Sequence, residues 1–349
     1  MAQSSLHSCA ESNSALYPGG TPPICPEVRL AILLRYLAGG MVLDMILIYH
    51  VCKAEVYRTI WRVMDAVNAA LPTRCPWRDP EQLAILEAGF RSISKTLAWI
   101  GQVAALDGCH FTTISPGVSV DNPRVYYVPR KGHFCTLASA ACDHLRRFID
   151  WSIECTPTTH DSAAFAQSRL GKIIANEGLP GAYFINGDSA YALGPHMVVP
   201  YNIPEYTNFD FYQSSNRMAI ECAFGMLIRR WGILWRPFRV HHNRRGPLIG
   251  CCMRLHNLCI DFRISEEKLP EMNGEDAVCV PGDGCVGNRM TETPIFDRYG
   301  RPLEYLDWGT KRKCPPNTEK GKTREDLRVK LDAAGAARPR IRANPRPSE

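Results

Sequence analysis

The stretch GAYFINGDSAY, residues 181–191, places an apolar run directly before an acidic residue. The run is short and apolar, which is typical of a buried strand. Asp188 and the small residue Ser189 follow it at once. Two interpretations are open at this point. Either Ser189 is the nucleophile of a hydrolase, or Asp188 is a metal ligand at the end of a strand.

Asp107 repeats this arrangement in the stretch QVAALDG, residues 102–108. Side chains at the ends of adjacent strands can converge on one crevice. Glu221 lies within the apolar helix RMAIECAFGML, and we expect that helix to carry it into the interior, where a carboxylate needs a partner or a metal. Three converging carboxylates favour hard divalent cations such as Mg²⁺. Two such ions can clamp the attacking and leaving oxygens of a phosphodiester.

Each acid also has a structural interpretation. An Asp before a Gly is usually a turn residue, and Glu221 can pair with Arg217 one turn earlier. The GDS triplet resembles the nucleophile block of a family of lipases and esterases, and DGCH at 107–110 supplies an Asp-x-x-His. The two blocks stand here in the reverse of that family's order, and GDSAY does not match G-x-S-x-G. The serine-hydrolase interpretation is therefore disfavoured.

The surrounding pattern predicts one α/β domain over residues 99–263. Strands are expected at 99–108, 110–115, 133–143, 146–156 and 181–187, and helices at 162–178, 214–231 and 246–262. Several strands followed by a helix, a strand and further helices indicate a layered α/β or α+β architecture.

The N-terminal part of the chain has a different pattern. Residues 1–24 are polar and predicted to be disordered. Residues 25–72 predict three short helices with a tight turn between the second and third, which indicates a helix-turn-helix-like domain or a plain helical bundle. The third helix carries Lys53, Arg58 and Arg62 on one side. Residues 73–98 are predicted to be a linker with one helix.

The C-terminal region, residues 264–349, is rich in Pro, Gly and charge and is predicted to be mostly disordered. From Lys311 onward it holds twelve Lys/Arg against five Asp/Glu, whereas the rest of the chain holds 29 against 30. The net charge of +6 is therefore a property of the tail. Such a tail attracts nucleic acid or is simply solvated. KRK at 311–313 is a short candidate nuclear localisation signal.

Composition narrows the class of protein. The chain has 349 residues, of which 45% are apolar, enough for a sizeable core. The first residues lack the pattern of a signal peptide, and the longest apolar run, residues 41–52, is too short for a membrane span. We therefore expect a soluble protein that is not secreted. The fifteen cysteines include no C-x-x-C pair, which argues against a disulfide framework.

Cys252, His256 and Cys259 lie on one helical face at positions i, i+4 and i+7. A zinc site is conceivable there, but the same spacing is that of an ordinary buried helix stripe, which we favour.

Taken together, the motifs resemble the PIF/Harbinger transposase family of DDE superfamily endonucleases. The resembling blocks appear in order between residues 26 and 262: VAALDGCHF, YYVPRKGHFCTLASAACD, TTHDSAAF, GDSAYALGPHMVVPY, FDFYQSSNRMAIECAFGMLIRRWGIL and CMRLHNLCID. The resemblance implies a ribonuclease-H-like mixed sheet flanked by helices. It also implies that Asp107, Asp188 and Glu221 bind two divalent cations, Mg²⁺ or Mn²⁺, and cleave DNA.

The resemblance further implies phosphate contacts at Arg130, Lys131, Arg229 and Arg230, although solvated surface charge is the alternative. It implies a nuclear location and a Myb-like DNA-binding partner. His160 and Asp161 match a family block outside the acid triad, where they orient a metal-bound water or open the following helix, with Asp161 as its cap.

Several positions depart from the family pattern, namely Cys109, Val128, Pro129, Ser139 and Pro157. None of them removes a triad acid. They permit the alternative of a domesticated or decayed protein that binds DNA on the same scaffold without cutting it.

Overall fold

The computed structural model describes residues 24–266 and 321–338. The predictions for residues 1–23 and for most of the tail, including residues 311–313, lie outside the described residues. Within the described ranges no helix combines the length and apolarity that crossing a bilayer requires.

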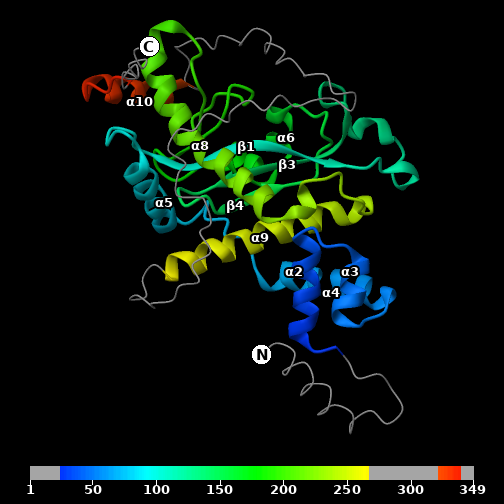
Figure 1. Ribbon diagram of the computed structural model, residues 1–349. Helices are drawn as coiled ribbons and strands as arrows, with labels where there is room; N and C mark the ends of the chain where they lie inside the picture. Colours follow the sequence, from blue (N-terminus) through cyan, green and yellow to red (C-terminus); the bar gives the residue numbers. More distant parts are fainter. Residues whose placement is uncertain (1–23, 267–320, 339–349) are drawn as a thin grey trace, which may run out of the picture.

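A mixed sheet forms the centre of the molecule (Figure 1). Its strands are β1 (Gln102–Thr113), β2 (Tyr127–Val128), β3 (His133–Cys142), β4 (Phe148–Ser152), β5 (Phe184–Asn186) and β6 (Met197–Val198). β3 pairs antiparallel with β1, β2 and β4, whereas β5 is parallel to β1 and β6 is parallel to β5. The predicted α/β class and the pairing of residues 133–143 with 146–156 are confirmed. The two short runs expected at 99–108 and 110–115 form one continuous strand, β1.

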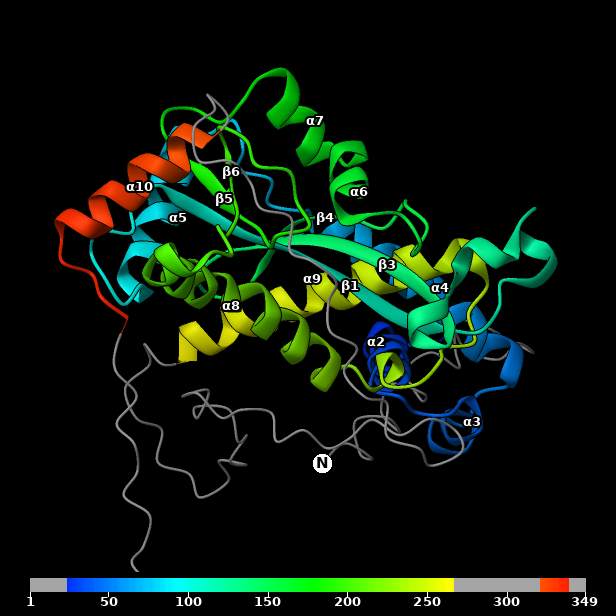
Figure 2. The same ribbon diagram turned by 90° about the horizontal axis from the view of Figure 1, so that it is seen from above.

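Helices flank the sheet on both faces (Figure 2). α8 (Thr207–Arg230) and α9 (His242–Glu266) lie on one face, and α6 (Asp161–Gln167) and α7 (Arg169–Asn176) lie on the other. Successive side chains of a strand point to opposite faces. Accordingly, Ala105 and Phe111 join a core cluster with α8 and α9, whereas Ala104 and Leu106 join a second cluster with Leu170 of α7.

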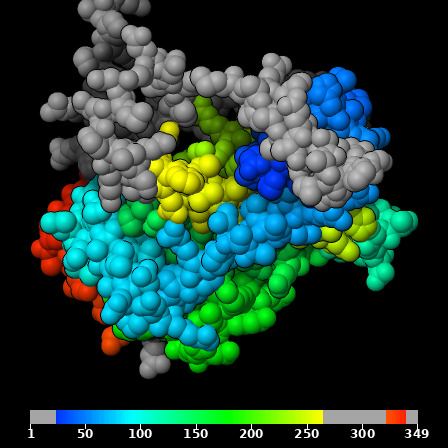
Figure 3. Space-filling model, turned by 90° about the horizontal axis from the view of Figure 1, so that it is seen from below, coloured from blue at the N-terminus to red at the C-terminus, as the bar shows by residue number. Residues whose placement is uncertain are grey.

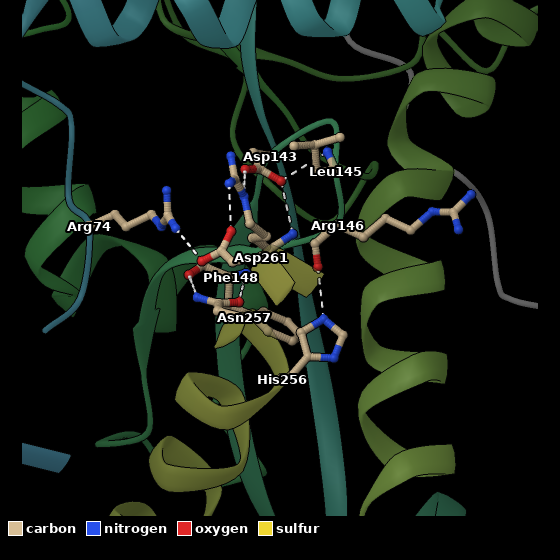
Figure 4. A network of polar contacts seen from close by, with 9 residues as sticks. Arg74, Asp143, Leu145, Arg146, Phe148, His256, Asn257 and Asp261 are labelled. Atoms are coloured by element: carbon tan, nitrogen blue, oxygen red, sulfur yellow. Dashed lines mark hydrogen bonds and ion pairs between the residues drawn. The ribbon is translucent and has the colours of Figure 1, made fainter. Parts of the chain in front are cut away.

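The second half of α9 is tied to the turn between β3 and β4 (Figure 4). The Asn257 side chain accepts from Phe148 N at 2.8 Å and donates to Phe148 O at 2.7 Å. Asp143, which is fully buried, accepts hydrogen bonds from the Arg147 backbone and side chain, and Arg147 also pairs with Asp261 at 2.9 Å. Buried polar groups that satisfy one another in this way fix the register of packed elements.

The N-terminal helices are α2 (Pro26–Leu37), α3 (Val42–Tyr49) and α4 (Lys53–Ala70). α4 packs against α9 (Figure 3). At this contact the Asn68 side chain donates to Pro247 O at 2.9 Å and Arg254 donates to Leu71 O at 2.6 Å. The apolar residues of α2 and α4 belong to the same core cluster as those of α8 and α9. The three-helix unit is thus joined to the sheet domain by a continuous core.

Two helices outside the central blocks also cover the sheet domain. α5 (Pro80–Ile93), the helix expected within residues 73–98, begins at the Asp79 cap and buries Leu83, Leu86 and Phe90. α10 (Lys322–Ala333), in the segment predicted as a mostly disordered tail, buries Leu327 and Leu331 in a cluster with Trp99, Phe184 and Tyr201.

Candidate active site

Asp107 and Asp188 occupy equivalent positions on two neighbouring parallel strands. Ala105 of β1 pairs with Asn186 of β5, and each aspartate lies two residues further along its own strand direction. The carboxyl ends of parallel strands open on one edge of a sheet, where polar side chains can meet a ligand. The structure therefore brings Asp107 and Asp188 together, as the sequence predicts.

Asp107 does not end its strand, contrary to the sequence-based expectation. β1 continues to Thr113 because β3 remains paired with it up to Phe134. β5, in contrast, ends at Asn186. Asp107 therefore lies where β1 loses its parallel neighbour but keeps its antiparallel one, which opens space on one side of a firmly held backbone.

A buried amide pair fixes the end of β5. Gln213 of α8 donates to Asn186 Oδ1 at 2.7 Å and to Gly187 O at 2.6 Å, and Asn186 donates to Gln213 O at 2.9 Å. Asp188 then turns the chain, since its Oδ1 accepts from Ala190 N at 2.9 Å. The bonds to Gln213 hold the backbone before Asp188, and the bond from Ala190 N holds the Asp188 carboxylate itself. Together they restrict where this carboxylate can lie.

The environment of Asp107 makes its carboxylate harder to ionise than usual. Burial raises the pKa of Asp107 to about 6, and the nearby charges of Asp188 and Glu221 act in the same direction. The Gly108 N–H and the Arg217 guanidinium oppose this shift. A carboxyl with a pKa near neutrality in a cleft is a candidate functional group.

Glu221 is not in the interior, which corrects the sequence-based expectation. Its side chain is 48% exposed, and Arg217 Nη2 lies 2.6 Å from its Oε1. The buried stripe of α8 runs through Asn216, Ile220 and Ala223, and Glu221 lies beside this stripe. α8 therefore buries its apolar stripe while the carboxylate of the adjacent Glu221 stays at the surface.

Arg217 stands between two of the three predicted acids. Its Nη1 lies 3.4 Å from Asp107 Oδ2 while its Nη2 contacts Glu221. The part of the chain that the structure describes contains no group of three or more acid, His or Cys side chains placed to hold a metal ion. Asp107 and Asp188 supply the oxygen donors that Mg²⁺ and Mn²⁺ prefer, but Glu221 is engaged elsewhere, so the three acids do not fit a metal site as arranged.

Asp161 is a functional candidate that the sequence motif indicated only weakly. An ideal Cβ on Gly108 would lie 2.9 Å from Asp161 Oδ1, so the carboxylate approaches β1 from the face opposite to Asp107. Burial raises the pKa of Asp161, and the Asp188 charge adds to the effect. The helix cap is His160, whose Nδ1 accepts from Ser162 N, and not Asp161 as expected.

Tyr191 completes this group of acids. Its side chain is almost fully buried, and burial raises the pKa of its hydroxyl well above the usual range. The carboxylates of Asp107, Asp161 and Asp188 all contribute to that shift. The hydroxyl makes no hydrogen bond of normal geometry to a described residue. The Tyr191 ring packs edge-on against Phe165.

An open cavity of about 620 Å³ adjoins Asp188. It is lined by Asp188 and Ser189, by the loop residues Asn202 and Pro204, and by the face of α8 that carries Arg217. A hollow that is mostly polar and borders carboxylates suits an extended polar substrate better than a small apolar one.

The predicted phosphate contacts lie in two separate places. Arg130 and Lys131 are exposed on the segment between β1 and β3, and both lower the pKa of Asp161 through their charge. Arg229 and Arg230 are exposed at the C-terminal end of α8.

Two alternatives from the sequence find no support in the site. His110 Nε2 contacts the Pro157 carbonyl at 3.0 Å, burial lowers the pKa of this ring to about 4, and within the described ranges His110 forms no hydrogen bond with Ser189. His256 Nε2 likewise contacts the Arg146 carbonyl at 2.9 Å. Cys252, His256 and Cys259 do not form a metal cluster among the described residues.

Comparison with known proteins gives one family. The family described as DDE superfamily endonuclease matches residues 106–257, which supports assignment to the DDE nuclease superfamily. No curated protein and no solved structure matches the chain. The matched range begins beside Asp107 and includes Asp161, Asp188, Arg217 and Glu221.

Proposed function

We propose, on the premise that residues 106–257 match the DDE superfamily endonucleases, that this protein is a divalent-metal-dependent DNA endonuclease of the two-metal, strand-transferring kind. The observation that carries the proposal is the matching position of Asp107 and Asp188, each two residues beyond the last pair that β1 forms with the parallel strand β5. The strand order, in which β3 pairs antiparallel with β1, β2 and β4 and the sheet continues from β1 through the parallel strands β5 and β6, supports a ribonuclease-H-like arrangement of the sheet. DNA is the substrate that the nuclease family implies.

Each group of the site has a proposed task. Asp107 and Asp188 would hold the divalent ions, which would offset the charge that develops at a phosphodiester. Asp107 acts in its ionised form, which its pKa of about 6 allows at neutral pH. Glu221 would serve as a third ligand only in an arrangement in which its ion pair with Arg217 is broken, and the Arg217 guanidinium would then be free to contact a phosphate.

A second candidate function is a DNA-binding protein on the same scaffold that has lost cleavage. The position of Arg217 between Asp107 and Glu221 favours it, because a fixed cation there neutralises the acids without metal. The PIF/Harbinger subtype, a nuclear location and a Myb-like partner stay predictions from the sequence resemblance.

Plasmid nicking separates these candidates. The purified full chain is incubated with supercoiled plasmid in Mg²⁺, in Mn²⁺ and in EDTA. Nicking that requires the metal, is lost in Asp188→Ala and is retained in Ser189→Ala supports the endonuclease. DNA binding without nicking supports the second candidate. Loss of nicking in Ser189→Ala alone would contradict both.

A further inference from the structure

A long segment that begins within the matched region and ends just beyond it carries only positive charge. Residues 222–260 contain seven arginines and no aspartate or glutamate. Solvated surfaces usually mix both signs of charge, so an acid-free stretch of this length is unusual for a surface without a ligand. Arg244, Arg245 and Arg254 of this segment have structural partners, namely Asp65, the Ile114 carbonyl and the Leu71 carbonyl.

The other four arginines face outward. Arg229, Arg230, Arg236 and Arg239 are all exposed, and none forms an ion pair with another residue in the described ranges. Together with Trp235 they form what we call the 229–241 surface. It lies at the end of α8 and along the loop that leads into α9.

The loop of this surface is anchored at one end of β1. Phe238 and Val240 are buried, and Phe238 N donates to Thr112 O at 3.3 Å. Arg245 fixes the same region by donating to Ile114 O at 2.9 Å. Buried residues on both sides of Arg239 therefore hold its side chain outward on a rigid backbone.

Trp235 is an exposed aromatic residue with a fixed position. Its side chain is 65% exposed, while its indole Nε1 donates to the Ile228 carbonyl. The indole N–H is thus satisfied within the protein, and the ring faces remain available. A large exposed aromatic face between arginines is the combination that stacks on a nucleic-acid base while the cations hold the backbone.

The segment between β1 and β3, residues 114–132, extends this basic region. Tyr126 contacts His242 at the start of α9, with Tyr126 Oη 3.2 Å from His242 Nε2. In Figures 1 and 2 the segment projects beyond the body of the molecule past the ends of β1 and β3. It carries the exposed residues Arg124, Arg130 and Lys131, and the last two act on the charge of Asp161.

We propose that the 229–241 surface binds the DNA strand that flanks the cleavage position. Arg229, Arg230, Arg236 and Arg239 contact backbone phosphates, and Trp235 stacks on an unpaired base. This inference rests on the proposed function for the location of the cut, but the binding itself needs neither metal nor catalysis.

The geometry places this contact several nucleotides from the cut. Arg229 lies eight residues beyond Glu221 on α8, or about 12 Å along the helix. Thr113, beside the anchored loop, lies six residues beyond Asp107 on β1, or about 20 Å along the strand. Because successive phosphates of one DNA strand are spaced by about 3.4 Å along the axis, the surface meets DNA about four to six nucleotides from the acids.

Binding in EDTA tests the inference without cleavage. Fluorescence anisotropy is measured over a range of salt concentrations with a labelled blunt duplex and with the same duplex carrying a short single-stranded extension. Arg236→Ala/Arg239→Ala should lower the slope of log Kd against log salt by about two, since each lost phosphate contact removes about 0.9. Trp235→Ala should weaken binding of the extended DNA roughly five- to hundredfold and leave blunt duplex nearly unchanged. Trp235→Phe should restore most of this binding.

The matched control removes two cations elsewhere. Lys172 on α7 and Lys330 on α10 are both exposed, and Lys172→Ala/Lys330→Ala should leave both the slope and the affinity unchanged. Thermal unfolding of each variant confirms that it is folded. Equal salt slopes for the arginine and lysine variants would overturn the inference, as would equal affinity of the wild-type chain for poly-L-glutamate and for DNA.

The two proposals fail in different ways. If wild type nicks plasmid but the arginine and Trp235 variants bind DNA as wild type does, the proposed DNA contact of the 229–241 surface is wrong and the proposed endonuclease activity holds. If binding depends on the surface but wild type nicks nothing, the endonuclease is wrong and the surface stands.

Discussion

Arg217 holds the Glu221 carboxylate across one helical turn, with Nη2 2.6 Å from Oε1, while its other amino group faces Asp107. A fixed cation at this position competes with any divalent ion for the same carboxylates. Arg217→Gln should therefore tighten Mn²⁺ binding severalfold, measured by isothermal titration.

Arg91 supplies the control for this measurement because it forms a similar i,i+4 pair with Glu87, on α5. Arg91→Gln should leave Mn²⁺ affinity unchanged. Weaker Mn²⁺ binding in Arg217→Gln would contradict the competition between Arg217 and the metal.

Asp161 should matter for cleavage and not for DNA affinity. Its carboxylate lies against Gly108, next to Asp107 along β1, and its charge is coupled to that of Asp188. Asp161→Asn should lower the nicking rate roughly ten- to hundredfold, the range expected when a group that orients metal-binding residues is removed. Affinity for duplex DNA in EDTA should stay within about twofold of wild type. An unchanged nicking rate would exclude Asp161 from the site.

α10 should contribute measurably to the stability of the sheet domain. Leu327 is 2% exposed within a cluster that includes Trp99 and Phe184, whereas Val329 on the same helix is 52% exposed. Leu327→Ala should lower the free energy of unfolding by about 2–5 kcal/mol, and Val329→Ala by less than about 0.5 kcal/mol. Denaturant unfolding measures both, and equal effects would show that α10 is not packed as described.

Because Asp150 is buried, the free energy of unfolding of wild type relative to that of Asp150→Asn should depend on pH. Burial raises the pKa of Asp150 to about 6 from its ordinary 3.8, so the folded chain holds a proton that the unfolded chain releases between these values. The stability from this group is present below about pH 4 and is lost as the pH rises through about 6. Asparagine cannot ionise, and its amide oxygen can still accept the hydrogen bond that Trp77 donates to Asp150 at 2.6 Å.

The unfolding free energy of Asp150→Asn relative to wild type should therefore increase from about pH 4 to about pH 8, by on the order of 2 kcal/mol. Denaturant melts of the two proteins at the two pH values provide the comparison. A difference that stays constant with pH would show that folding does not raise the pKa of Asp150.

The sequence was sufficient to predict the α/β class, the antiparallel pairing of β3 with β4 and the proximity of Asp107 to Asp188. Those predictions rest on apolar runs, two of which end in Asp107 and Asp188, because a short apolar run of this kind is typical of a buried strand. The continuity of β1 through Asp107 was not predicted, since the sequence indicated two separate runs at 99–108 and 110–115, and it is the pairing with β3 that joins them into one strand.

The orientation of α8 was harder to predict for a related reason. Apolar residues surround Glu221 in sequence, so the pattern alone does not say which side of the helix is buried. β6 has only two residues, and α10 presents Leu327 and Leu331 within a highly charged segment. Their positions depend on contacts with distant parts of the chain, which no local pattern encodes.

Whether Asp107 acts in cleavage is tested most directly by the plasmid-nicking rate in Mn²⁺ of wild type, Asp107→Asn and Asp121→Asn. Asp121 is exposed on the 114–132 segment, and Asp121→Asn changes the charge of the chain by the same amount as Asp107→Asn. We expect wild type and Asp121→Asn to nick the plasmid. In Asp107→Asn the nicking rate should fall roughly a thousandfold or more, as expected when a group of the reacting centre is removed. Equal nicking rates in Asp107→Asn and Asp121→Asn would contradict this expectation.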